Sequence, residues 1–292
     1  MTPVRKNSFA SSGVSRDNSP IMTQLLSIQS SVAVGFVGNT IAGPVLTALG
    51  HQPLLVDTVL LAAHPGYGKR AGGAIPADIL AAVLEGVLTL ADASRIATII
   101  SGYLGTAEQV EGIAAFIDEW RRQAAGTYIL DPVLGDGGRL YVAPEIAAAM
   151  QDELLPRADI ITPNRYELTY LSGQDVDDLA GAAEAAGLLI ARHGLQAVVA
   201  TGILDAEGRT GDLLVRPEGD ALWQPAGATA KNVAGGGDLL TSLLAGLLGL
   251  GHPLADAFAS ASKTAHAIIA ASPDGRDLSL LDSLDEVARL GG

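Results

Sequence analysis

Short apolar runs alternate with helical patterns along most of the chain. Six runs lack polar alternation and predict strands buried on both faces, at residues 24–28, 54–61, 97–101, 127–130, 159–162 and 197–201. Between them, apolar residues at helical spacing predict helices at 38–49, 77–88, 107–123, 144–154 and 177–192. This alternation predicts an α/β fold with a central, mostly parallel sheet and right-handed crossovers.

The last third of the chain departs from this alternation. Two short runs, 211–216 and 221–224, predict a hairpin at the edge of the sheet, and apolar helices are expected at 237–250, 253–271 and 280–290. No repeat or linker follows residue 20, so residues 21–292 are expected to form a single domain. Residues 1–20 are rich in serine and have no apolar stretch, which predicts a disordered leader.

Charge and composition exclude several classes of function. The chain has 32 acidic and 18 basic side chains and a net charge of -14, which argues against nucleic acid or an anionic membrane surface as a partner. The absence of cysteine excludes disulfides, a thiolate nucleophile and cysteine-based metal sites. No window reaches the roughly 18 apolar residues of a membrane-spanning helix, so we expect a cytoplasmic protein.

Polar side chains follow the predicted strands where each one ends. Parallel sheets bind ligands beyond the carboxyl ends of their strands, so these positions are candidates for a site. They are Ser30 after the first strand, Gly102 and Tyr103 after the third, Asp131 and Asp136 after the fourth, Thr162, Asn164 and Glu167 after the fifth, and Thr201 and Gly202 after the sixth. Taken alone, each of these residues would be interpreted as a helix cap, a surface residue or a strand terminator.

A glycine-rich segment, Gly235-Gly236-Gly237-Asp238, precedes a strongly apolar helical pattern. Glycines let the backbone approach a ligand closely, and the free amides of a helix N-terminus bind anions. An acid at the same place can accept the proton of a hydroxyl that attacks phosphorus. The segment matches neither a Walker A loop nor GxGxxG, and the five histidines have no metal-ligand spacing.

Several segments together resemble the pyridoxal kinases of the ribokinase-like superfamily. They include SIQSSVAVGFVGN (27–39), SGYLG (101–105), DPVLGD (131–136), LLPRADIITPNRYELTYLSG (154–173) and GGGDLL (235–240). The resemblance spans residues 24–250 and implies a three-layer α-β-α ribokinase-like fold. It also implies phosphorylation by ATP of the 5′-hydroxymethyl group of pyridoxal, and of pyridoxine or pyridoxamine, in vitamin B6 salvage.

The resemblance also implies a role for each candidate residue. Asp238 matches the catalytic base, and Gly235, Gly236 and Gly237 match the anion hole. Asp131 and Glu167 match acids near Mg²⁺ and ATP. The remaining positions match the nucleotide side (Asp136, Tyr141, Thr162, Asn164, Thr201 and Gly202) and the vitamer side (Ser30, Val37, Val59, His64, Pro65 and Tyr103). A homodimer is implied, and a K⁺ or Na⁺ ion beside ATP is an open option.

Three positions depart from the family pattern. Gly236 and Pro65 stand where the family usually has threonine, and Ser31 stands where a histidine is usual. Gly236 removes a hydroxyl and loosens the loop, whereas Pro65 offers neither a hydroxyl nor an amide hydrogen. Two alternatives therefore stay open: a kinase for another hydroxymethyl heterocycle such as hydroxymethylpyrimidine, and a non-catalytic protein that binds the vitamer or a nucleotide.

Overall fold

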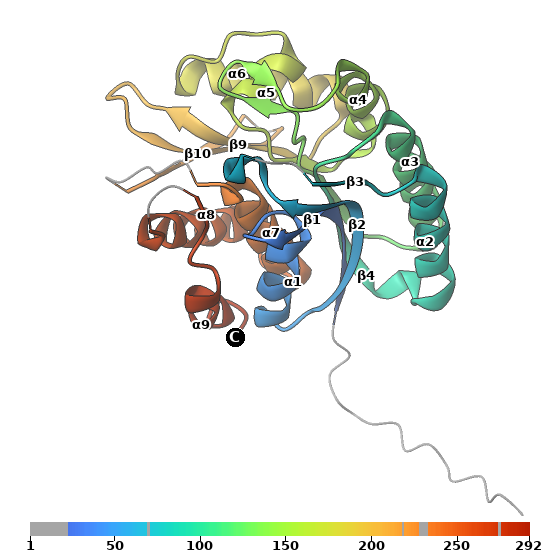
Figure 1. Ribbon diagram of the computed structural model, residues 1–292. Helices are drawn as coiled ribbons and strands as arrows, with labels where there is room; N and C mark the ends of the chain where they lie inside the picture. The colour runs from blue at the N-terminus through green and yellow to red at the C-terminus, as the bar shows by residue number, and fades with distance from the viewer. Residues whose placement is uncertain (1–22, 69–70, 218, 228–232, 274–275) are drawn as a thin grey trace, which may run out of the picture.

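The protein is built on one nine-stranded sheet. The computed structural model describes residues 23–292 except 69–70, 218, 228–232 and 274–275, and the predicted leader (1–20) lies outside these residues. The strand order is β11-β10-β9-β8-β5-β4-β1-β2-β3. Figure 1 shows helices covering both faces of this sheet, which gives the predicted three layers.

Six strands pair in parallel and form the centre of the sheet: β1 (Gln24–Val34), β2 (Gln52–Ala63), β4 (Ile96–Ser101), β5 (Thr127–Leu130), β8 (Ile160–Ile161) and β9 (Ala197–Leu204). Antiparallel strands extend both edges: β3 (Gly72–Ala74) beside β2, and β10 (Thr210–Val215) and β11 (Ala221–Pro225) beside β9. The mostly parallel sheet and the edge hairpin are thus confirmed. The sequence did not predict β3 or the small β6 (Gly135–Asp136) and β7 (Arg139–Leu140) pair, because two or three residues show no periodicity.

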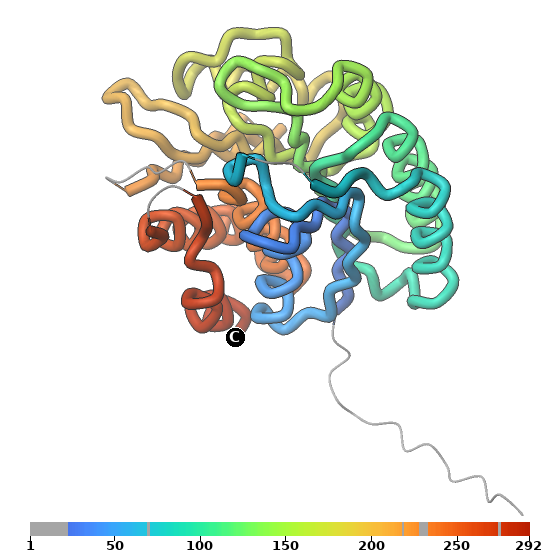
Figure 2. Tube along the Cα trace, in the orientation of Figure 1, coloured from blue at the N-terminus to red at the C-terminus, as the bar shows by residue number. Residues whose placement is uncertain are grey.

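The helices divide into two groups by the face that they cover. One face carries α1 (Asn39–Ala48), α7 (Gly236–Gly249), α8 (Leu254–Ala271) and α9 (Leu284–Ala288). The other carries α2 (Ala77–Leu90), α3 (Ala107–Gln123), α4 (Pro144–Ala149), α5 (Arg165–Ser172) and α6 (Leu179–His193). Figure 2 shows that α1, in blue, lies beside α7 and α9, in orange and red, although they are far apart in the sequence.

Strands buried on both faces hold these layers together. In β1, Leu25 belongs to the core beneath α1 and α7, whereas Leu26 and Ile28 belong to the core beneath α2 and α3. All three side chains are fully buried. This explains the uniformly apolar strands in the sequence. Among the described residues, no helix has the length and apolar character needed to cross a membrane.

The topology places a crevice at one edge of the sheet. Strand β1 has β2 on one side and β4 on the other, so the crossover from β1 to β2 and the later return to β4 run in opposite directions across the sheet. Such a reversal opens a crevice beyond the carboxyl ends of the strands. The carboxyl-terminal parts of β1 and β9 and the residues that follow β4, β5 and β8 therefore meet there.

We predict that Asp178→Ala destabilises the protein by about 1 kcal/mol, the usual effect of losing a helix cap. Asp178 is the N-cap of α6, and its carboxylate accepts a hydrogen bond of 2.9 Å from the Gly181 amide. Urea unfolding measures the change. Asp177→Ala is the matched control, because Asp177 is exposed beside the cap and is not the capping residue; equal losses in both variants would contradict the capping role.

Candidate active site

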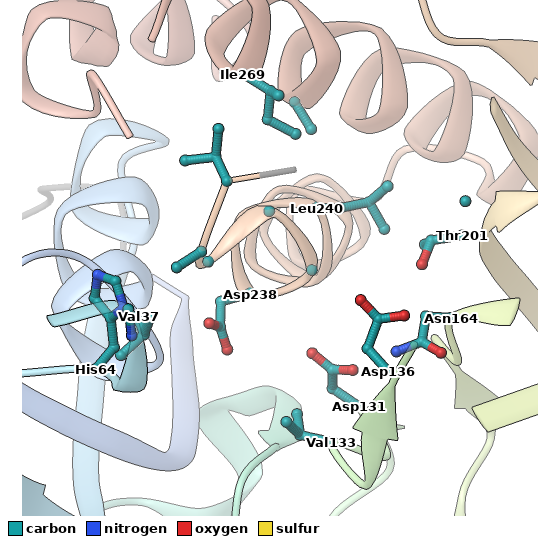
Figure 3. Close-up of a pocket in the computed structure, with 18 of the residues that line it drawn as sticks. Val37, His64, Asp131, Val133, Asp136, Asn164, Thr201, Asp238, Leu240 and Ile269 are labelled. Atoms are coloured by element: carbon teal, nitrogen blue, oxygen red, sulfur yellow. The ribbon is translucent and has the colours of Figure 1, made fainter. Parts of the chain in front are cut away.

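A cavity of about 1560 Å³ lies at the carboxyl edge of the sheet. Its walls come from the carboxyl-terminal parts of β1, β2 and β9, from residues after β1, β2, β4, β5 and β8, and from the N-terminus of α7. Ser30, Thr201 and Gly202, expected just after strands, lie within β1 and β9, because these strands run further than the apolar runs indicated. Figure 3 shows Asp238 between two groups of side chains, with Val37 and His64 on one side and Asp131, Asp136 and Asn164 on the other. The cavity thus has two ends that meet at Asp238.

The start of α7 depends on a left-handed turn at Gly235. This N-cap has a φ of 86°, and a Cβ there would lie 2.6 Å from both Ile41 Cδ1 and the Phe36 carbonyl oxygen. Only glycine fits such a position without strain. The first amides of a helix have no partner within the helix, so this turn leaves the amides of Gly236, Gly237 and Asp238 available at the cavity. They form a site suited to an anion.

Asp238 lies in the first turn of α7 and lines the cavity. Burial raises the pKa of its carboxyl group, and a hydrogen bond from the backbone amide of Gly38 opposes that rise. Gly38 has a φ of 53°, and a Cβ at this position would lie 2.2 Å from the Ser30 carbonyl oxygen. The close approach of the β1–α1 loop therefore fixes Asp238 between the two ends of the cavity.

Asp131 follows β5 and is only 4% exposed. Its carboxylate accepts a hydrogen bond of 3.4 Å from Thr241 Oγ1, and that hydroxyl lies 2.9 Å from Thr162 Oγ1. Burial raises the pKa of Asp131 well above its ordinary value, and the nearby Asp238 and Glu167 carboxylates raise it further. A cation beside Asp131 would relieve this repulsion.

The donor set fits Mg²⁺ better than a metal held by protein ligands alone. Within the described residues, no three His, Cys, Asp or Glu side chains are grouped to hold a metal ion. Mg²⁺ usually takes one or two carboxylates and completes its shell with water and phosphate oxygens. Asp131, in the cavity wall, can supply such a carboxylate.

Glu167 joins the loop after β5 to the start of α5. Its Oε1 accepts hydrogen bonds from the Leu134 and Gly135 amides at 2.9 and 3.3 Å, and its Oε2 accepts one from the Asn164 amide at 2.9 Å. With the Asn164 side chain it forms a capping box. Both oxygens therefore have protein partners, which makes Asp131 the better-placed direct ligand; the expected contact of Glu167 with the metal stays a prediction.

The end of the cavity that contains Asp131 and Glu167 also holds the residues expected on the nucleotide side. Asn164 Nδ2 donates to the Gly135 carbonyl at 2.8 Å, and Asn164 also pairs with Thr201 in a parallel bridge. Asp136, Tyr141, Thr162 and Gly202 line the same cavity. All eight residues expected at the nucleotide are thus brought to one cavity.

Five of the six residues expected on the vitamer side also line the cavity: Ser30, Val37, His64, Pro65 and Tyr103. Val59 does not. It is 3% exposed on β2, where it packs toward the loop at Gly105. The loop at Gly105 covers Val59 and keeps it out of the cavity wall.

Sequence reasoning missed one part of the cavity wall. Asp212 on β10 and His266 on α8 line it, with Asp212 Oδ2 2.9 Å from His266 Nε2, and Ser262 donates to the same oxygen at 2.6 Å. Arg276 and Asp277, beyond α8, line it as well. None of these follows a parallel strand, so the rule based on strand ends gave no signal for them.

We predict that Glu167→Gln flattens the pH dependence of stability in metal-free protein. Burial raises the pKa of Glu167 to about 8 from its ordinary 4.5. Between these pH values the folded protein holds a proton that the unfolded chain releases, so the free energy of unfolding falls as pH rises. Glutamine cannot titrate, which removes this contribution.

Urea unfolding across that pH range, with EDTA present, measures the slope for each variant. Glu145→Gln is the control, because Glu145 is exposed in the first turn of α4. A slope in Glu167→Gln equal to that of the unaltered protein would contradict the prediction.

Comparisons with known proteins agree with this geometry. Residues 42–278 match the family model of phosphomethylpyrimidine kinase. A pyridoxal kinase PdxY from Rubrobacter xylanophilus is 35% identical over 84% of this chain and 86% of its own length. One from Corynebacterium diphtheriae is 31% identical over 90% and 95%.

Solved structures show the same architecture. Pyridoxal kinase from Leishmania donovani in complex with ADP and pyridoxamine superposes with a TM-score of 0.82 at 28% identity, covering 91% of this chain and 95% of that one. Pyridoxal kinase from Lactobacillus plantarum gives 0.80 at 27% identity, covering 92% and 98%. The chain therefore belongs to the phosphomethylpyrimidine kinase family and, within the ribokinase-like superfamily, to the pyridoxal kinases.

Proposed function

We propose that this protein transfers the γ-phosphoryl group of ATP to the 5′-hydroxymethyl group of pyridoxal, and also of pyridoxine and pyridoxamine. The observation that carries the proposal is the position of Asp238, in the first turn of α7 between the two ends of one cavity. The relatives named pyridoxal kinase supply the substrate class. The Leishmania donovani complexes, which hold ADP with pyridoxamine or pyridoxine, support the pairing of nucleotide and vitamer.

In this mechanism, Asp238 accepts the proton of the 5′-hydroxyl group as its oxygen attacks the γ-phosphorus. The new oxygen–phosphorus bond forms while the bond to the β-phosphate oxygen breaks, and ADP leaves. The amides of Gly236 and Gly237 donate hydrogen bonds to the phosphoryl oxygens, where they are already oriented for the developing charge. Burial raises the pKa of Asp238, which makes its carboxylate a stronger base.

Asp131 would hold Mg²⁺, with Glu167 organising the adjoining loop. When bound, Mg²⁺ neutralises charge on the β- and γ-phosphate oxygens. Asn164 and Thr201 fix the loops at the nucleotide end through their parallel bridge. A monovalent cation beside ATP, K⁺ or Na⁺, is part of the proposal by family resemblance alone.

We further propose a homodimer that works in the cytoplasm. The edge strand β3 is short and exposed, and the neighbouring Leu60 on β2 is 55% exposed. Ile79 and Val83 of α2 are also about half exposed. Exposed apolar side chains at a sheet edge support burial against a second subunit.

An ADP-release assay with pyridoxal, pyridoxine, pyridoxamine and hydroxymethylpyrimidine tests the proposed substrate class. We expect turnover of at least one B6 vitamer at a higher kcat/KM than the pyrimidine. Preference for the pyrimidine would favour the alternative that the name of the matching family suggests. ATP or pyridoxal binding in calorimetry without ADP release would favour a non-catalytic protein.

We predict that Asp238→Asn lowers kcat by about a thousandfold, within the usual contribution of a general base. The amide keeps the size of the side chain but cannot accept the proton, so the Kd for ATP should change little. ADP-release assays measure kcat, and calorimetry measures the Kd for ATP. Asp177→Asn, an exposed change outside the cavity lining, serves as control. Near-normal turnover in Asp238→Asn would remove it as the base.

We predict that Gly236→Thr raises kcat. A Cβ at this position would lie 3.2 Å from Ile269 Cδ1, the end of a flexible side chain, so a small shift admits it. The threonine would stiffen the anion-binding turn and add a hydroxyl donor. Gly236→Ala is the matched control, because it stiffens the backbone without the hydroxyl. A fall in kcat with threonine but not alanine would show that this glycine is an adaptation.

A further inference from the structure

Four side chains from two distant segments meet at one end of the cavity, and three of them, His64, Arg276 and Asp277, line it. His64 and Tyr67 belong to the turn after β2, and Arg276 and Asp277 lie beyond α8. Asp277 Oδ1 is 3.1 Å from His64 Nε2, and Tyr67 donates a hydrogen bond of 2.6 Å to Oδ2. Arg276 Nε donates to the same Oδ2 at 3.2 Å, and its guanidinium lies 4.1 Å over the Tyr67 ring. We call these four side chains the Asp277 clasp.

The clasp uses both nitrogens of His64. Nδ1 accepts a hydrogen bond of 3.2 Å from the Gly66 amide, so the ring proton is on Nε2. This N–H donates a hydrogen bond to Asp277. The ring is 3% exposed and stands edge-on to Tyr67 at 5.0 Å. His64 therefore has no hydrogen bond left to offer a ligand, although its ring forms part of the wall.

Asp277 is the shared acceptor of the clasp. Burial tends to raise the pKa of this carboxyl group, but the hydrogen bonds from Tyr67, His64 and Arg276 lower it below the ordinary value. Asp277 is therefore ionised at neutral pH, and three donors converge on one negative charge. Hydrogen bonds to a charged acceptor are stronger than neutral ones.

Two glycines let the backbone close tightly around the clasp. A Cβ at Gly35 would lie 2.5 Å from Asp277 Oδ1 and 3.0 Å from His64 Cδ2. A Cβ at Gly66 would lie 2.7 Å from His64 Cε1. The loop after β1 and the turn after β2 thus meet Asp277 with no side chain between them. Pro65, between His64 and Gly66, further restricts the turn because its φ is fixed.

We propose that Asp277 is a positioning residue that holds the His64–Gly68 turn closed over the vitamer end of the cavity and so sets the affinity for the vitamer. Pro65 has no amide hydrogen, and both His64 nitrogens are already engaged. The turn therefore contributes shape and apolar contact, and that shape depends on the Asp277 carboxylate. This inference rests on the proposed function, because the ligand of this end is taken to be a B6 vitamer.

The test is Asp277→Asn, compared with the unaltered protein. An amide has a single acceptor oxygen, so the clasp loses either the His64 hydrogen bond or the Tyr67 and Arg276 hydrogen bonds together. We expect KM for pyridoxal to rise about tenfold, the effect of one charge-assisted hydrogen bond, with kcat and KM for ATP nearly unchanged. Titration of pyridoxal absorbance in the absence of ATP should show the same weakening of Kd.

Two further variants keep the test decisive. Tyr67→Phe keeps the ring beneath Arg276 and removes one donor, so it should raise KM for pyridoxal in the same direction even if Asp277→Asn folds poorly. Asp282→Asn, an exposed change a few residues along the chain, should leave all constants unaltered.

The outcomes separate this inference from the proposed function. If the unaltered protein phosphorylates a vitamer but Asp277→Asn and Tyr67→Phe leave its KM and Kd unchanged, the positioning role is wrong. Equal rises in KM for pyridoxal and ATP would also overturn it, since a general structural defect acts on both ends. If the unaltered protein turns over no vitamer and does not bind pyridoxal, the proposed function fails first.

Discussion

The left-handed turn at Gly235 is the constraint on which the site depends. It starts α7 at the floor of the cavity, so that the helix presents free amides and Asp238 to the same small volume. Ile41 and Phe36 leave no space for a side chain at this turn. The buried apolar body of α7 anchors the turn against α1 and the sheet, because its leucines form the core of that face. The position of Asp238 and the rigidity of the Gly235 turn therefore come from packing rather than from a ligand.

The second constraint is the accumulation of buried carboxyl groups without a buried cationic partner in the described part of the site. Burial raises the pKa of both Asp131 and Asp238, and the nearby Asp238 and Glu167 carboxylates raise the pKa of Asp131 further. Three backbone amides donate hydrogen bonds to Glu167, and these bonds hold the loop after β5 against the start of α5. The arrangement favours a divalent cation at Asp131 with phosphate oxygens in its shell.

Strand ends, glycine spacing and resemblance predicted most of this site because the chemistry follows the parallel sheet. Every residue expected on the nucleotide side lines the cavity, whereas Val59 does not, because the distant loop at Gly105 packs over it and only folding brings that loop to β2. Helix α5 was missed because its eight residues are too few to show a helical period, although the capping box of Asn164 and Glu167 is a signal for a helix start. No feature of the sequence indicated a role for Asp277, because its partner His64 lies 213 positions away and only folding brings them together.

The central claim is that this cavity joins ATP to the hydroxymethyl group of a B6 vitamer. The most direct measurement is phosphorus NMR of the protein incubated with ATP, Mg²⁺ and pyridoxal. The account predicts a phosphomonoester signal from pyridoxal 5′-phosphate that grows in step with ADP. ADP with free inorganic phosphate, or no ADP at all, would contradict it.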